Sequence, residues 1–73
     1  MEALRNARIK GDIVYFGDDA RGGIHYLLDD LDYNEARVFF TQARSRGEVR
    51  FEDDDARLFV LQYSDGKYVL VRR

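Results

Sequence analysis

The chain has 73 residues with a net charge of −2, and it contains neither cysteine nor proline. This length predicts a single domain spanning 1–73, and the missing cysteine excludes a disulfide framework and a thiolate zinc site. Hydrophobic residues make up 45% of the sequence, which is too many for a disordered chain. No apolar run approaches the roughly 20 residues that a membrane helix needs. Residues 1–8 also lack the apolar core of a signal peptide, so we expect a cytoplasmic protein with no membrane span.

The first predicted elements form a hairpin. Residues 1–8 are expected to be a flexible tail or a short helical turn, because few apolar side chains could anchor them. Residues 12–16 (DIVYF) are β-branched and aromatic, which is typical of a strand. The segment 17–23 predicts a turn-rich loop, and 24–28 (IHYLL) predicts a second strand that pairs with the first in antiparallel fashion.

A helix is predicted over 33–46. Asp32 is a good N-cap, and Glu35 three residues later completes a capping-box pattern. Gly47 can adopt the left-handed conformation that ends a helix. Apolar side chains recur on one stripe at about 100° per residue, so this stripe is expected to face the core. Its members are Tyr33, Ala36, Phe39, Phe40 and Ala43.

Three more strands are predicted after the helix, over 48–52, 57–63 and 68–71. Asp65 and Gly66 form a preferred two-residue hairpin turn between the last two. The element order is therefore ββαβββ. We expect a small α+β domain with a mainly antiparallel five-stranded sheet and one helix packed on one face. Whether the first hairpin lies at the centre or the edge of the sheet stays open.

The last hairpin turn also predicts which side chains share a face of the sheet. It pairs Tyr63 with Tyr68 and Leu61 with Leu70, and paired residues lie on the same face. If the preceding loop has four residues, 53–56, the core face carries Val49, Phe51, Leu58, Val60, Val69 and Val71. The opposite face then carries Arg50, Phe59, Leu61, Tyr63, Tyr68, Leu70 and Arg72. An odd loop length would reverse this assignment, because a shift of one residue turns every side chain over.

The second face is the strongest functional signal in the sequence. One helix covers only one face of such a sheet, so the large apolar side chains on the other need another cover. Tyr and Arg are also the side chains that dominate interface hot spots. We therefore expect these seven residues to bind a protein partner, a second copy of the chain, or both, as in a small regulator or inhibitor of a larger protein. The first hairpin or the N-terminal segment could instead fold over this face.

Two alternatives use the same surface. Its aromatic side chains could stack the bases of single-stranded RNA, while basic side chains track the phosphates. These basic residues are Arg50, Arg57, Lys67, Arg72 and Arg73. The less favoured alternative is a small toxin-like ribonuclease that uses Arg50, Tyr63, Tyr68 and Arg72. The net charge of −2 and the acidic residues 53–55 disfavour both, because nucleic acid is a polyanion.

No motif predicts catalysis, a cofactor or a metal site. His25 is the only histidine, and the sequence shows no nucleophile or acid that would act with it. Residues 30–34 begin like a calcium loop, but Glu35 stands where that loop needs glycine, and Thr41 stands where its bidentate glutamate belongs. We therefore expect a non-catalytic protein that needs neither cofactor nor metal.

Overall fold

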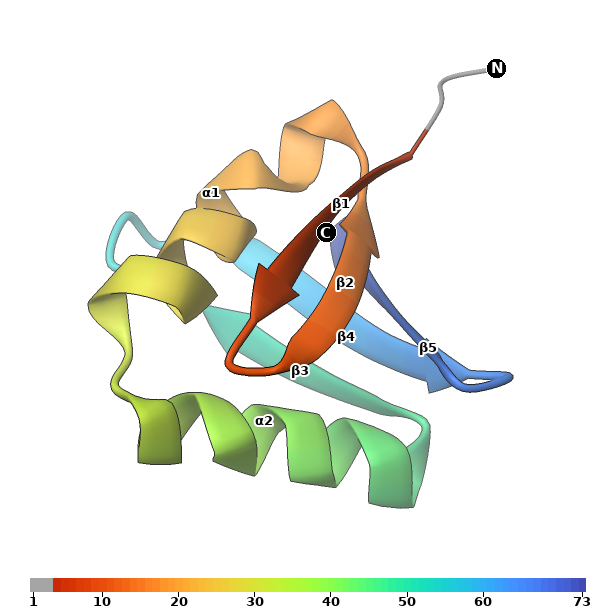
Figure 1. Ribbon diagram of the computed structural model, residues 1–73. Helices are drawn as coiled ribbons and strands as arrows, with labels where there is room; N and C mark the ends of the chain where they lie inside the picture. Colours follow the sequence, from red (N-terminus) through yellow and green to blue (C-terminus); the bar gives the residue numbers. More distant parts are fainter. Residues whose placement is uncertain (1–3) are drawn as a thin grey trace.

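Within residues 4–73, which the computed structural model describes, five strands form one mixed sheet with two helices on one side of it (Figure 1). The sheet order is β1-β2-β5-β4-β3. Strands β2 and β5 pair in parallel, whereas the other three pairings are antiparallel. The predicted α+β class and mainly antiparallel sheet are thus confirmed, with one helix more than expected. The elements are β1 (Arg5–Ile9), β2 (Asp12–Phe16), α1 (Arg21–His25), α2 (Tyr33–Arg46), β3 (Glu48–Glu52), β4 (Leu58–Ser64) and β5 (Lys67–Arg72).

The first hairpin joins β1 to β2, rather than 12–16 to 24–28 as predicted. Lys10 and Gly11 form its turn with φ values of 52° and 92°, the two left-handed positions that a tight hairpin turn requires. The expectation of a tail or helical turn over 1–8 is wrong for residues 5–8, which belong to β1. Residues 1–3 lie outside the described residues.

Residues 18–30 are helical, so the strand predicted over 24–28 is wrong. A 3-10 turn, η1 (Asp18–Ala20), leads into α1, and a π-helical turn, η2 (Tyr26–Asp30), follows it. The buried positions in this segment recur at i, i+3, i+4 and i+7, which is the spacing of one helix face. They are Ala20, Gly23, Ile24 and Leu27. Two adjacent glycines obscured this pattern, because glycine is about 1 kcal/mol worse than alanine in a helix.

These two glycines allow α1 to approach the sheet and the β3–β4 loop closely. A β-carbon on Gly23 would lie 2.8 Å from the Leu70 side chain and 2.9 Å from that of Phe59. A β-carbon on Gly22 would lie 2.5 Å from the Arg57 guanidinium. The close packing of α1 therefore offsets its poor intrinsic propensity.

Helix α2 has the predicted bounds and both predicted caps. The Asp32 carboxylate accepts a hydrogen bond from the Glu35 backbone N–H at 2.8 Å, and the Asp32 N–H donates to the Glu35 carboxylate at 3.0 Å. Gly47 ends the helix with a φ of 91°, and its N–H donates to the Ala43 carbonyl at 2.7 Å. Both ends of α2 are therefore specified by local sequence.

The apolar stripe of α2 faces the core, with one exception. Ala36, Phe40 and Ala43 are buried, and Phe39 is half-buried. Tyr33 is 56% exposed, so its predicted core position is wrong. It lies in the first turn and about 60° around the helix axis from Ala36, at the margin of the stripe.

The loop between β3 and β4 has five residues, 53–57, and not four. Phe51 therefore pairs with Phe59, and Val49 pairs with Leu61. This register differs by one residue from the prediction. The β4–β5 register agrees with it, and its pairs include Phe59–Arg72, Leu61–Leu70, Tyr63–Tyr68 and Ser64–Lys67.

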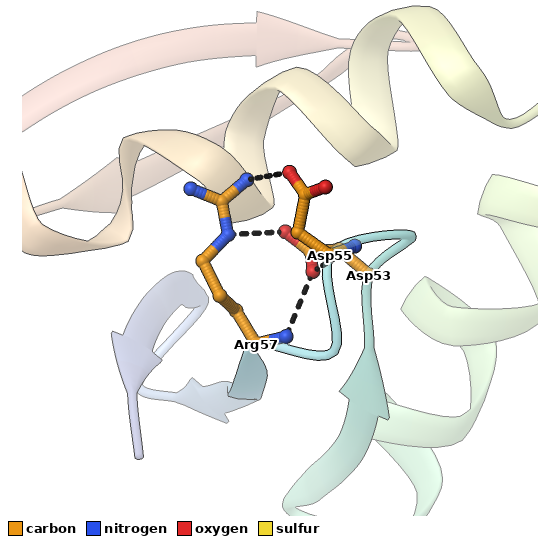
Figure 2. Close-up of polar contacts among 3 residues, drawn as sticks. All are labelled: Asp53, Asp55 and Arg57. Carbon is orange, nitrogen blue, oxygen red and sulfur yellow. Dashed lines mark hydrogen bonds and ion pairs between the residues drawn. The ribbon is translucent and has the colours of Figure 1, made fainter.

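Asp53 holds this five-residue loop together (Figure 2). Its buried carboxylate accepts hydrogen bonds from the backbone N–H groups of Asp55 at 3.0 Å and Arg57 at 2.9 Å, and from Arg57 Nε at 2.8 Å. Burial alone would raise the pKa of Asp53, but these hydrogen bonds and the guanidinium charge lower the pKa below its ordinary value of 3.8. Ala56 takes a left-handed φ of 63°, which lets the chain turn back into β4.

Candidate functional site: the open face of the sheet

The shifted register places most of the predicted binding face in the core. Four of its seven residues are buried beneath the helices, namely Phe59, Leu61, Tyr68 and Leu70. The prediction that they form an exposed surface is wrong, because the odd loop length puts them on the same face as Phe51. The ring of Phe51 stacks on Phe59 with centroids 5.6 Å apart, and Phe40 meets Tyr68 edge-on at 4.9 Å.

The other three predicted site residues lie apart from one another. Tyr63 is half-buried on the covered face, with the Arg44 guanidinium 5.6 Å from its ring centroid. Arg72 is exposed at the end of β5, in register with Phe59. Arg50 is exposed on the opposite face. The structure therefore does not bring the seven residues together as one surface.

No helix within residues 4–73 covers the other side of the sheet, which we call the open face (Figure 1). Its apolar side chains come from three neighbouring strands. They are Ile13 and Tyr15 on β2, Val69 and Val71 on β5, and Leu58 and Val60 on β4. Four of these six residues were expected in the core, so the faces of β4 and β5 are exchanged relative to the prediction, whereas those of β3 are as predicted.

The apolar side chains of the open face form a continuous stripe across the strands. Tyr15 is in register with Val69, and Val71 is in register with Val60. The most exposed members are Leu58 at 52%, Ile13 at 43% and Val71 at 40%. Tyr15 and Val69 are partly exposed, and Val60 is buried between its neighbours at 5%. Single exposed apolar residues are ordinary, whereas several on one face are typical of an interaction surface.

Charged side chains flank this stripe and differ between the two edges of the sheet. On the open face, edge strand β1 carries Arg8, whereas edge strand β3 carries Glu48, Arg50 and Glu52. Arg50 Nε lies 3.3 Å from the Glu48 carboxylate. One edge is thus basic, and the other carries a net negative charge.

A shallow depression lies at the end of the open face where β3 and β4 meet their loop. Its volume is about 330 Å³. The Arg73 N–H donates to the Leu58 carbonyl at 2.8 Å, which holds the last residue against the rim. The depression could receive a side chain from a bound protein. Its lining comes from Arg50, Phe51, Glu52, Leu58, Phe59 and Arg73.

The residues considered for ribonuclease chemistry do not converge. Arg50 lies on the open face, whereas Tyr63 and Tyr68 lie on the covered face. His25 is exposed, and its Nδ1 lies 2.7 Å from the Asp29 carboxylate one turn along the same helical segment. In the described part of the chain, no three His, Asp or Glu side chains are grouped so that they could hold a metal ion.

Two features of the sequence indicate which face of the sheet the helices cover. Asp53 begins the loop, and aspartate side chains commonly accept hydrogen bonds from backbone N–H groups two residues further on. A loop closed by such hydrogen bonds can have five residues as well as the four that were assumed. The expected binding face was also the one with the largest side chains, which are the ones needed to fill the space under a helix layer.

Comparison with known proteins found no protein-family model, no curated protein and no solved structure that matches the chain. None of the helices within residues 4–73 is long and apolar enough to cross a membrane. The function is therefore inferred from the geometry of the open face.

Proposed function

We propose that this protein is a non-catalytic cytoplasmic interaction module whose open face binds a second copy of the chain. The observation that carries the proposal is the uncovered apolar stripe across β2, β5 and β4, with Leu58, Ile13 and Val71 each at least 40% exposed. Burying such a stripe against another protein stabilises a complex by about 25 cal/mol for each Å² of apolar surface removed from water.

The charges at the margins favour a second copy as the occupant. A two-fold axis parallel to the strands lays β1 of one copy over β3 of the other. Arg8 of each copy then faces the end of β3 in the other copy that carries Glu48, whereas Glu52 lies at the far end of that strand. The apolar stripes run diagonally across the strands, so this axis makes the two stripes cross at Val69 and Val71 on β5. Opposite charges at both margins would fix the orientation of the two copies.

The RNA-binding alternative loses its main support. Stacking of bases needs several exposed aromatic rings on one platform. Phe59 and Tyr68 are buried under the helices, and Tyr15 is the aromatic side chain on the open face among residues 4–73. The Lys67 ammonium already lies 5.9 Å from the centroid of the Tyr15 ring.

The proposal is tested by the solution mass of the chain, measured by light scattering over a range of concentrations. The double variant Leu58→Ser plus Val71→Ser should weaken self-association by about tenfold or more while the domain stays folded, because both side chains are already exposed. Val38→Ser is the matched control. Val38 is 52% exposed on α2, far from the open face in the fold, and its loss should leave the mass unchanged.

High salt should weaken the dimer only modestly, since apolar burial supplies most of the stabilisation. A wild-type chain that stays monomeric at the highest attainable concentration would contradict self-association and point to a different protein partner. Equal association by the wild type and the Leu58 and Val71 double variant would contradict the assignment of the open face.

A further inference from the structure

A second depression lies on the covered side of the sheet, between α2 and the start of β5. Its volume is about 330 Å³. Unlike the end of the open face, it is lined mainly by groups that can hydrogen-bond: two guanidinium groups and three hydroxyls. The lining residues are Arg37, Phe40, Thr41, Arg44, Ser45 and Tyr68.

The helical spacing explains why four of these side chains share one face of α2. Thr41 and Ser45 are four residues apart, and Arg37 and Arg44 are seven apart, so all four project from the same side. Arg37 and Arg44 are separated by two helical turns, about 10.5 Å along the axis. Both long side chains can therefore reach a ligand that is seated between them, beside the Thr41 hydroxyl.

Tyr68 supplies an observation that is independent of the helix. It is only 5% exposed, and its ring packs edge-on against Phe40. No hydrogen bond from residues 4–73 reaches its hydroxyl. The hydroxyl is not sealed from solvent, because no fully buried side-chain oxygen is left without a partner among the described residues. It is thus an open hydrogen-bonding group on the wall of the depression.

The surrounding charges favour an anion. Besides Arg37 and Arg44, the Asp12 carboxylate lies nearby, 3.6 Å from an Arg37 nitrogen. Burial raises the pKa of Tyr68, as does the Asp12 charge, whereas Arg44 and Arg37 act in the opposite direction. The same three charged groups therefore surround the hydroxyl. The charged side chains that line the depression itself, Arg37 and Arg44, are both positive.

We propose that this depression binds a phosphate group, held by the guanidinium groups of Arg37 and Arg44 and by the hydroxyls of Thr41, Ser45 and Tyr68. Guanidinium groups form paired, charge-assisted hydrogen bonds with phosphate oxygens. Each hydroxyl can donate one further hydrogen bond. The site lies on the opposite side of the sheet from the open face, so it is independent of the proposed self-association.

The experiment is a titration of the chain, observed by amide chemical shifts, with inorganic phosphate against sodium chloride at equal ionic strength. We expect saturable shifts at Thr41, Ser45 and Tyr68 with phosphate alone. The double variant Arg37→Gln plus Arg44→Gln should lower the affinity by about tenfold or more, since it removes charge-assisted hydrogen bonds. Tyr68→Phe keeps the ring and should lower the affinity by about threefold.

The matched control is Arg21→Gln plus Arg46→Gln, which removes two positive charges from exposed positions outside both depressions. It should bind phosphate within about twofold of the wild type, because neither side chain is needed for the hydrogen bonds. Phenyl phosphate as a second probe distinguishes the source of the group. Tighter binding of the ester indicates a phosphorylated organic ligand, and equal binding indicates the free anion.

Three results would overturn the proposal. The first is amide chemical-shift changes that do not saturate as phosphate is added. The second is chemical-shift changes of equal size with sodium chloride. The third is undiminished binding by the Arg37 and Arg44 double variant in a chain whose spectrum shows it to be folded.

Discussion

The two faces of the sheet are both apolar but differ in the size of their side chains. On β4 and β5 the covered face presents Phe59, Leu61, Tyr68 and Leu70, whereas the open face presents Leu58, Val60, Val69 and Val71. Large side chains fill the space beneath the helices, and the three smaller, β-branched valines pack against their neighbours on the pleated surface. Apolar content therefore identifies the strands, but side-chain volume is the better guide to which face is the core.

The difference between the two faces is tested most directly by truncating, one at a time, two adjacent residues that point to opposite faces. Phe59→Ala should lower the free energy of unfolding by about 3–5 kcal/mol, because it leaves a cavity where a fully buried ring stood. Leu58→Ala should cost less than about 1 kcal/mol, because Leu58 is half exposed. Urea unfolding of both variants measures the difference. Similar losses for the two would mean that the faces are not distinct.

A smaller loss of stability is expected from variants that disturb the close contact of α1 with the covered face. Gly23→Ala should cost about 1–3 kcal/mol, because its β-carbon would meet the Leu70 and Phe59 side chains in a packed interior. Gly22→Ala is the control. Its β-carbon would meet the Arg57 guanidinium, which can shift at the cost of weakening its contacts with Asp53 and Asp55 but without disturbing the packed interior. The melting temperature of Gly22→Ala should therefore lie well above that of Gly23→Ala. The reverse order would mean that α1 packs differently.

The smallest expected effect concerns the Asp53 loop, residues 53–57, whose length sets which side chains of β3 and β4 share a face. Asp53 has a lowered pKa in the folded chain, so its carboxylate stabilises the fold above its ordinary pKa of 3.8, and this contribution is lost as the pH falls through the lower folded value. Asp53→Asn should destabilise the protein near neutral pH. The difference from the wild type should shrink in strong acid. A difference that is independent of pH would show that the charge of Asp53 does not matter.

Helix α2 and the β4–β5 hairpin could be predicted because their signals are local. Asp32 and Glu35 begin the helix, and Gly47 ends it, through hydrogen bonds and a backbone conformation that involve only near neighbours. Asp65 and Gly66 take φ values of 55° and 77°, as a two-residue hairpin turn requires. These features hold whatever the rest of the chain does.

The remaining elements could not be predicted because the interactions that stabilise them involve residues far away in the sequence. Helix α1 contains two glycines that are unfavourable locally and become favourable only against Leu70, Phe59 and Arg57. Strand β1 is polar at most positions and is recognisable mainly by its pairing with β2. The open face depended on one further fact, the number of residues in the Asp53 loop, and an error of one residue moved every side chain of β3 relative to β4.

The parallel pairing of β2 with β5 has a consequence for how the chain folds during synthesis. Strand β5 is the last of the described strands to be made, yet it lies in the middle of the sheet between β2 and β4. Until it emerges from the ribosome, the β1–β2 and β3–β4 hairpins have no strand to join them. An isolated hairpin is marginal in water. Sheet completion is therefore postponed until β5 has emerged and can pair with β2 and β4 together.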